Sequence, residues 1–152
     1  MPTPTGTISM SDVNTELGRS STANISLNET AVRTLAGVAS GTISMDNLRG
    51  KSNVSFSPDG GTSAGAPVAL YDYASGGGVA SVTISCSASA SWSYTRSGSF
   101  GFPATGSTTG TSVTFNLSNP TASFRGTYWT VSATAGGITR YWTVQLDNDG
   151  YA

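Results

Sequence analysis

Residues 80–94 read Ala-Ser-Val-Thr-Ile-Ser-Cys-Ser-Ala-Ser-Ala-Ser-Trp-Ser-Tyr, and this stretch decides the fold class. Every even position is apolar or aromatic, and every odd position is Ser or Thr. A period of two is the pattern of a β-strand with one buried face and one solvent-facing face. Because fifteen residues are more than a usual strand contains, we predict two strands with a corner near residues 87–91.

Shorter runs of the same kind lie on both sides of this stretch. They predict further strands at 53–56, 68–73, 113–117, 127–134 and 138–146. Ala135-Gly136-Gly137 predicts a tight hairpin, turns are expected at 57–61 and 118–120, and residues 96–110 are expected to form a long loop. About seven short strands joined by turns favour a Greek-key sandwich of two sheets. Trp129, Val131 and Ala133 should face Trp142, Val144 and Leu146.

One segment of this region resembles the immunoglobulin fold. Gly126-x-Tyr128-x-Thr130 is similar to its tyrosine corner, with Thr130 in place of the second cysteine. The resemblance implies that Cys86 lies where the first cysteine lies and that Trp92 is the core tryptophan. Trp92 lies only six residues after Cys86, closer than the usual spacing in antibody domains, so the resemblance is to the broader bacterial and phage Ig-like domains. Cys86 itself is expected to be a small buried apolar residue.

The N-terminal third repeats a short motif three times. Residues 8–13 read Ile-Ser-Met-Ser-Asp-Val, residues 25–30 Ile-Ser-Leu-Asn-Glu-Thr, and residues 43–48 Ile-Ser-Met-Asp-Asn-Leu. A serine followed three residues later by Asp, Glu or Asn is a capping-box pattern, and an isoleucine before it is typical of a hydrophobic staple. We therefore predict short helices at 10–17, 27–36 and 45–49, of which the middle one is longest. The capping serines are Ser9, Ser26 and Ser44, and the terminating glycines are Gly18, Gly37 and Gly50.

These helices are too short, and their apolar residues too few, for an independent core of ordinary size. The segment therefore needs a surface to lie on. It either packs on the rest of the chain or forms a docking arm that orders on a partner or on copies of itself. The apolar residues expected to make that contact are Ile8, Met10, Val13, Leu17, Ile25, Leu27, Val32, Leu35, Ile43, Met45 and Leu48.

In their order and their amino-acid sequence, the three motifs of residues 6–52 resemble a module of tail-associated virion proteins of tailed bacteriophages. The resemblance implies a structural role in the virion, which is assembled in the host cytoplasm. It also implies other virion proteins, and copies of the chain itself, as partners. Because the family is defined by its place in the particle, it brings no catalytic residues.

Composition narrows the function further. Charged residues make up 10% of the chain, against about 25% in an average globular protein, and the net charge is -1. This balance argues against nucleic acid as a partner. No apolar run is long enough to predict membrane insertion. The chain has no histidine and a single cysteine, which disfavours an enzyme, a metal site and a cofactor.

Two weaker features remain. Asp147-Asn148-Asp149-Gly150 resembles the start of a calcium loop, but the twelve-residue loop ending in Glu that such a site needs is not present, so a solvated tail is the favoured interpretation over a weak cation site. Several aromatic residues are expected to be partly exposed and could contact host-surface glycans weakly: Tyr71, Tyr73, Phe100, Phe102, Tyr141 and Tyr151. The sequence thus predicts a mainly β chain, with a short-helix docking arm at 1–52 and an Ig-like Greek-key β-sandwich at 53–152. The expected function is a non-enzymatic part of a phage particle, at the tail or tail tip; the alternative is a cell-surface or glycan-binding adhesion domain.

Overall fold

The computed structural model describes residues 2–75, 78–98, 100–118 and 124–149. The chain divides into an N-terminal unit, Met1–Val54, and a β unit, Ser55–Ala152. This boundary lies two residues after the one expected from the change in sequence pattern. The turn expected at 118–120 and Tyr151 fall outside the described residues.

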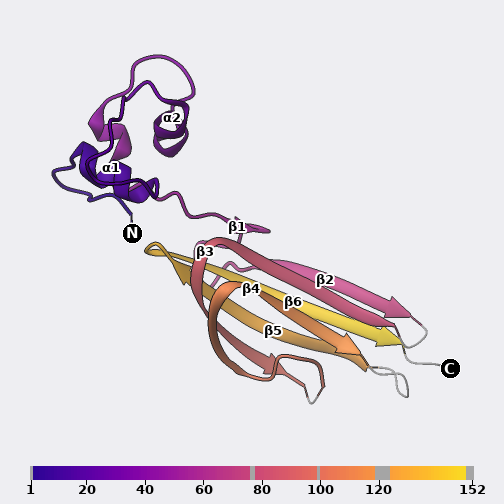
Figure 1. Cartoon of the computed structure of the whole chain (residues 1–152). Helices are drawn as coiled ribbons and strands as arrows, with labels where there is room; N and C mark the ends of the chain where they lie inside the picture. The colour runs from indigo at the N-terminus through magenta and orange to yellow at the C-terminus, as the bar shows by residue number, and fades with distance from the viewer. Residues whose placement is uncertain (1, 76–77, 99, 119–123, 150–152) are drawn as a thin grey trace. The chain divides into compact units, whose positions relative to one another are not determined.

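The β unit is a six-stranded sheet that curls on itself (Figure 1). Its strands are β1 (Phe56–Ser57), β2 (Val68–Ser75), β3 (Val79–Ser97), β4 (Gly106–Ser118), β5 (Phe124–Ala135) and β6 (Ile138–Asp149). The order is β1-β3-β5-β6-β2, and β4 pairs with β3 outside this path. All described pairs are antiparallel except β2 with β6, which run parallel.

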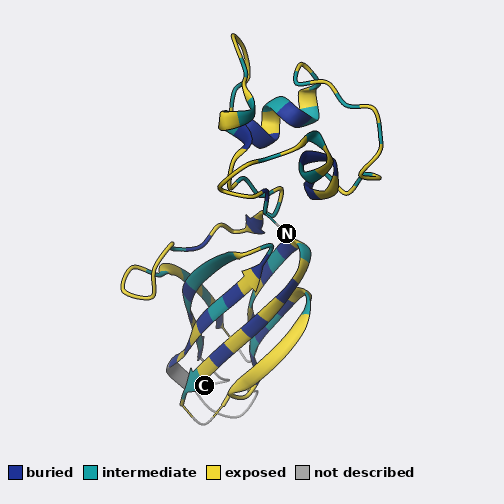
Figure 2. Cartoon of the chain, turned by 90° about the vertical axis from the view of Figure 1, so that its left-hand side faces the viewer, coloured by how far each residue is buried: buried dark blue, intermediate teal, exposed yellow. Residues whose placement is uncertain are grey.

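Strand β3 is continuous over 19 residues, so the prediction of two separate strands is wrong. The expected corner is present as a shift in register with β4 between Ser85 and Ala90. Before the shift β3 pairs with the second half of β4, and after it with the first half of β4 and with β5. The strand therefore bends without breaking, and both β3 and β4 curl in Figure 1. The alternation persists through the bend, as the bands of buried and exposed residues in Figure 2 show for this unit.

The prediction of a long loop at 96–110 is also wrong, because β4 begins at Gly106. The Ser- and Thr-rich start of β4 pairs with the aromatic end of β3, for example Thr108 opposite Trp92. Threonine suits a strand that has one solvent-facing side, and a neighbouring strand supplies the pairing that the local sequence does not signal. The connection between the end of β3 at Ser97 and the start of β4 at Gly106 is therefore shorter than predicted.

The hairpin between β5 and β6 is confirmed. Ala135 pairs with Ile138, and the two residues between them, Gly136 and Gly137, have φ of 54° and 75°. Two positive φ values define the turn that matches the twist of a hairpin, which explains the Gly-Gly pair. The residues predicted to face one another are all buried, namely Trp129, Val131, Ala133, Trp142, Val144 and Leu146.

Aromatic rings fill the centre of the β unit. Phe56 lies 5.5 Å from Trp142 and 6.1 Å from Trp92 between ring centroids, and Phe115 lies 5.4 Å from Trp129. Each tryptophan is at most 1% exposed. Each indole N–H donates to a backbone carbonyl, at 2.8 Å for Trp92 and Trp129 and 3.2 Å for Trp142. The core thus buries three large side chains without an unpaired indole donor.

Cys86 and Trp92 are buried, as predicted. Thr130, however, was expected to face inward in the place of a second cysteine, and it is exposed. Tyr128 on the same side of β5 is 46% exposed. Because neighbouring side chains of a strand point to opposite faces, burial of Trp129 and Val131 turns Tyr128 and Thr130 outward. The tyrosine-corner assignment is therefore wrong.

The N-terminal unit contains two short α-helices, α1 (Met10–Glu16) and α2 (Thr30–Ala36), and a 3-10 helix, η1 (Met45–Leu48). Their buried side chains form one cluster of Val13, Val32, Leu35, Ala36 and Leu48. Helix α1 lies close to its predicted range. Helix α2 starts three residues later than predicted and is no longer than α1, so the expectation of a longest middle helix is wrong.

Candidate functional site

The three repeated motifs of the N-terminal unit fold into three related local structures. In each, the backbone N–H of the serine donates to the side-chain oxygen three residues later. The N···O distances are 2.8 Å for Ser9 to Asp12, 2.8 Å for Ser26 to Glu29 and 2.9 Å for Ser44 to Asn47. Ser9 and Ser44 directly precede α1 and η1, so the capping boxes predicted there are confirmed.

Ser26 does not cap a helix, which corrects its predicted role. Its hydroxyl accepts from the N–H of Asn28 at 3.2 Å instead of from Glu29. Residues 27–29 therefore form a turn, and α2 begins at Thr30 with Glu29 as its N-cap. The Ser-to-Glu pairing survives because it needs only a tight turn and not a helix.

The predicted terminating glycines all have a left-handed backbone, with φ of 71° at Gly18, 75° at Gly37 and 64° at Gly50. Gly37 is the C-cap of α2, as predicted. After α1, the N–H of Gly18 donates to Thr15 and the N–H of Arg19 to Asn14, which satisfies the last carbonyls of the helix.

The start of the chain closes the unit, which the sequence did not signal. Thr3 is 3% exposed and exchanges hydrogen bonds with the backbone of Lys51: its N–H donates at 2.9 Å, and its hydroxyl accepts at 2.9 Å. The Thr3 hydroxyl also donates to the carbonyl of Leu48, and Gly50 donates to the carbonyl of Pro4. No local sequence motif identifies Thr3 as a structural residue. Its role is seen only from its contacts in the folded unit.

Most charges of the N-terminal unit are satisfied inside it. Arg19 pairs with Glu29 at 2.6 Å, and Arg49 with Asp46 at 3.0 Å. The guanidinium of Arg33 donates to Asn28 and to two carbonyls of the loop that follows α2.

Two carboxyl groups of the unit have shifted pKa values. Hydrogen bonds from the side chain and backbone of Ser9 lower the pKa of Asp12. The pKa of Glu29 is lowered by its hydrogen bond from Arg19 and then by the N–H of Ser26. Hydrogen bonding to Ser9 and to Arg19 and Ser26 thus favours the charged form of each carboxyl group.

The apolar residues predicted to dock lie mostly inside the unit. Val13, Val32, Leu35 and Leu48 form its cluster with Ala36. The others that pack against the cluster are Ile8, Leu17, Ile25, Leu27, Ile43 and Met45. Met10 is half-buried. Contact of these side chains with a partner stays a prediction, since the structure places them against one another.

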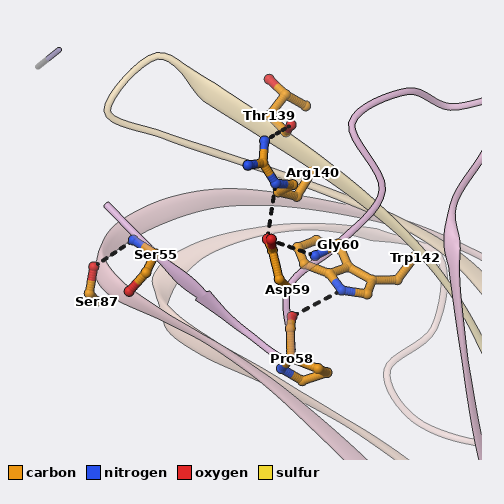
Figure 3. Close-up of polar contacts among 8 residues, drawn as sticks. All are labelled: Ser55, Pro58, Asp59, Gly60, Ser87, Thr139, Arg140 and Trp142. Atoms are coloured by element: carbon orange, nitrogen blue, oxygen red, sulfur yellow. Dashed lines mark hydrogen bonds and ion pairs between the residues drawn. The ribbon is translucent and has the colours of Figure 1, made fainter. Parts of the chain in front are cut away.

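In the β unit, residues 55–61 form a strap along the sheet (Figure 3). The N–H of Ser55 donates to the hydroxyl of Ser87 at 3.0 Å, and Pro58 accepts from the indole of Trp142. Asp59 pairs with Arg140 at 3.0 Å. A Cβ on Gly60 would lie 2.5 Å from the Trp142 ring, so only glycine lets the strap approach this closely. The turn expected at 57–61 is therefore not formed, and these residues belong to the extended strap.

At the end of the strap, the N–H of Gly61 donates to the carbonyl of Tyr141 at 2.9 Å, and the N–H of Tyr141 donates to the carbonyl of Gly61 at 3.0 Å. The loop at 61–67 then returns to β2 and borders a shallow groove of about 210 Å³. Four hydroxyl residues of the outward sheet face line this groove: Ser93, Thr95, Thr130 and Ser132. Tyr141, Pro67 and Ala64 also line it. The sequence indicated Tyr141 as a candidate contact but not the groove, which depends on strand register.

The other candidate aromatics are spread over the unit. Tyr71 is 60% exposed and Phe102 is 70% exposed, while Tyr73 and Phe100 are 46% exposed. The hydroxyl of Tyr71 donates to Asp147 at 3.3 Å. Asn148, next to Asp147, is buried and donates to Gly78, so these two residues of the suggested calcium loop point to opposite sides. The Asp149 side chain lies outside what is described.

Within the described residues, no cluster of three or more His, Cys, Asp or Glu side chains could hold a metal ion. Within the same residues, no helix has the length and apolar character required to cross a membrane. No protein-family model matches the chain, and no curated protein sequence is similar to it. Function is therefore argued from the two units themselves.

Proposed function

We propose that this chain is a non-enzymatic structural component of a tailed-bacteriophage particle, associated with the tail or its tip. In this proposal the N-terminal unit docks the chain to other virion proteins or to further copies, and the β unit is an Ig-like domain presented to the outside.

The observation that carries the proposal is the agreement between the repeated motif and the repeated structure. Three Ile-Ser motifs, the feature that resembles tail-associated proteins, form three related Ser-to-side-chain pairings in one small unit with its own apolar cluster. The pattern is thus a structural module of about 50 residues.

The surface of this module suits docking in a crowded assembly. Desolvating an unpaired charge is costly, and the ion pairs Arg19–Glu29 and Arg49–Asp46 already neutralise four charges locally. Its exposed residues include many Ser and Thr, such as Ser11, Thr15, Thr30 and Thr34. In this proposal the partly buried apolar residues at the edge of the cluster, such as Ile8, Leu17 and Ile25, make the docking contact, and the low-charge polar surface surrounds them.

The strand pairing supports an Ig-like β unit. One group of strands is β1, the first half of β3 and the second half of β4; the other is the remaining halves of β3 and β4 with β5, β6 and β2. In this proposal the two groups of the curled sheet act as the two layers that a Greek-key sandwich requires, with the aromatic core between them. Contact between Phe115 and Trp129 links the two groups.

The test is incorporation into particles. Tagged full-length chain, residues 1–54 and residues 55–152 are expressed separately during infection by a phage that lacks the gene, and purified virions are blotted. We expect the full chain and residues 1–54 in virions, and residues 55–152 to be absent. Incorporation of 55–152 at the level of the full chain would move docking to the β unit. Absence of the full chain from virions would overturn the structural role.

A further inference from the structure

The outward face formed by the second half of β3 with β5 and β6 carries an array of hydroxyl groups. The strand register aligns Ser93 with Ser132 and Ser132 with Tyr141 in one row across the sheet. The next row aligns Thr95, Thr130 and Thr143. Since neighbouring strands lie about 4.8 Å apart, each row presents hydroxyl groups at regular, short intervals.

The groove at residues 61–67 lies on this array. Its lining includes Ser93 and Ser132 of the first row and Thr95 and Thr130 of the second, with the Tyr141 ring beside them. None of its lining residues is charged. Thr130 donates to the carbonyl of Thr95 at 3.5 Å, whereas among the described residues the hydroxyls of Ser93, Ser132 and Tyr141 make no hydrogen bond to the protein.

The groove is held open by the backbone. Gly61 is fixed to Tyr141 by two hydrogen bonds, and Val68 begins the parallel pairing with β6 opposite Trp142. A Cβ on Gly61 would lie 2.0 Å from the carbonyl oxygen of Ala66, so the loop folds tightly on itself. The wall formed by Ala64 and Pro67 is therefore anchored at both ends and needs no ligand to form.

We propose that this groove binds a neutral sugar residue of a glycan chain. Hydroxyl groups both donate and accept, so Ser93 and Ser132 can pair with the hydroxyls on the rim of a sugar ring. The Tyr141 ring and Pro67 offer an apolar surface to its C–H face, and the Tyr141 hydroxyl offers a polar tip.

The chemistry of the groove disfavours charged and strongly apolar ligands. An anionic glycan or a nucleic acid needs lysine or arginine, and no such residue lines the groove. An apolar ligand would leave the hydroxyls of Ser93 and Ser132 desolvated without partners, which is costly. A neutral polyol avoids both problems. The inference concerns the β unit and is independent of how the N-terminal unit docks.

The test begins with the full-length chain on an array of neutral hexose oligosaccharides, with sialylated and sulfated glycans as charged counterparts. The neutral glycan that binds is then titrated against the wild type and variants. Tyr141→Ala and the double variant Ser93→Ala/Ser132→Ala should each weaken binding by about tenfold or more. Ser89→Ala, on the exposed side of β3 and outside the groove, is the matched control and should bind like the wild type.

The following binding results would overturn the proposal. No binding to any neutral glycan, or a preference for charged glycans, would exclude a neutral sugar site. Equal losses in Ser89→Ala and in Ser93→Ala/Ser132→Ala would place binding elsewhere on the sheet. Because Ser89 and Ser93 are exposed and Ser132 and Tyr141 are only half-buried, all variants should melt close to the wild type, and circular dichroism checks this. Loss of virion incorporation with intact glycan binding would separate this proposal from the structural one.

Discussion

Single glycines determine how the strap and its loop reach the sheet. At Gly61 an added methyl group would meet backbone atoms of Ala66 and Pro67, at 2.0 to 3.0 Å, and backbone cannot move aside cheaply. We expect Gly61→Ala to destabilise the β unit by about 1–3 kcal/mol, the usual cost of overpacking. Urea unfolding followed by tryptophan fluorescence measures this directly, because all three tryptophans belong to the β unit.

Gly65→Ala is the matched control. It lies in the same loop, has no left-handed φ, and a Cβ there would meet nothing within 4 Å. Its unfolding midpoint should stay near that of the wild type. If both variants unfold alike, close packing at Gly61 is not what fixes the loop.

The need for glycine at position 60, the neighbour of Gly61, could not be predicted from the sequence. Pro58-Asp59-Gly60-Gly61 has the composition of a turn, and a turn was the expectation. The requirement at Gly60 comes from Trp142, some eighty residues away in the chain. By contrast, Ser9 and Ser44 were identified correctly as caps, because a capping box is complete within four residues.

At the scale of elements, the hydrogen-bonded carboxylates of Asp12 and Glu29 make the N-terminal unit sensitive to acid. The pKa values of Asp12 and Glu29 are lowered in the folded state from 3.8 and 4.5 by the hydrogen bonds they accept. The unfolded chain therefore binds protons more readily, and their protonation favours unfolding. The stabilisation is complete above pH 4.5 and is lost as the pH falls through the lowered values. Ellipticity at 222 nm during thermal unfolding at pH 7, 4.5 and 3 should show this loss.

The variant Asp12→Asn/Glu29→Gln separates these groups from the other carboxylates. An amide oxygen can accept the same N–H, as Asn47 does from Ser44 in the third motif. The variant should therefore remain folded at pH 7 and lose less stability in acid than the wild type. An identical loss of stability in acid in both proteins would show that Asp12 and Glu29 do not cause the acid sensitivity.

The elements also show where sequence patterns stop being informative. Alternation predicted the faces of β3, but not that its two halves form one strand, since the bend comes from a change of partner at Ser85–Ala90. The start of β4 has no apolar alternation, and β3 alone supplies its pairing. The β5–β6 hairpin was predicted fully because Gly136-Gly137 encodes its turn locally. The groove was not predicted, because it needs the register of three strands and a distant loop.

At the scale of the molecule, the two units depend on different sources of stability. The β unit has a core of aromatic rings with three paired indoles, whereas the N-terminal unit depends on a small cluster and on short-range polar contacts. We therefore predict that residues 55–152 fold alone and unfold with the fluorescence midpoint of the full chain. An unfolded fragment, or one with a much lower midpoint, would show that the N-terminal unit supports the β core.

The position of the cut tests where the N-terminal unit ends. The buried carboxylate of Glu16 accepts the N–H of Asn53 at 2.6 Å, so this contact ties α1 to the last residues of the unit. Residues 1–54 keep the contact, and residues 1–52 lose it and leave a buried acceptor with one partner fewer, which costs stability. We expect 1–54 to have the greater ellipticity at 222 nm and the higher melting temperature. Equal melting of the two fragments would mean that Asn53 does not belong to the folded unit, and that the unit ends where the change in sequence pattern alone would place it.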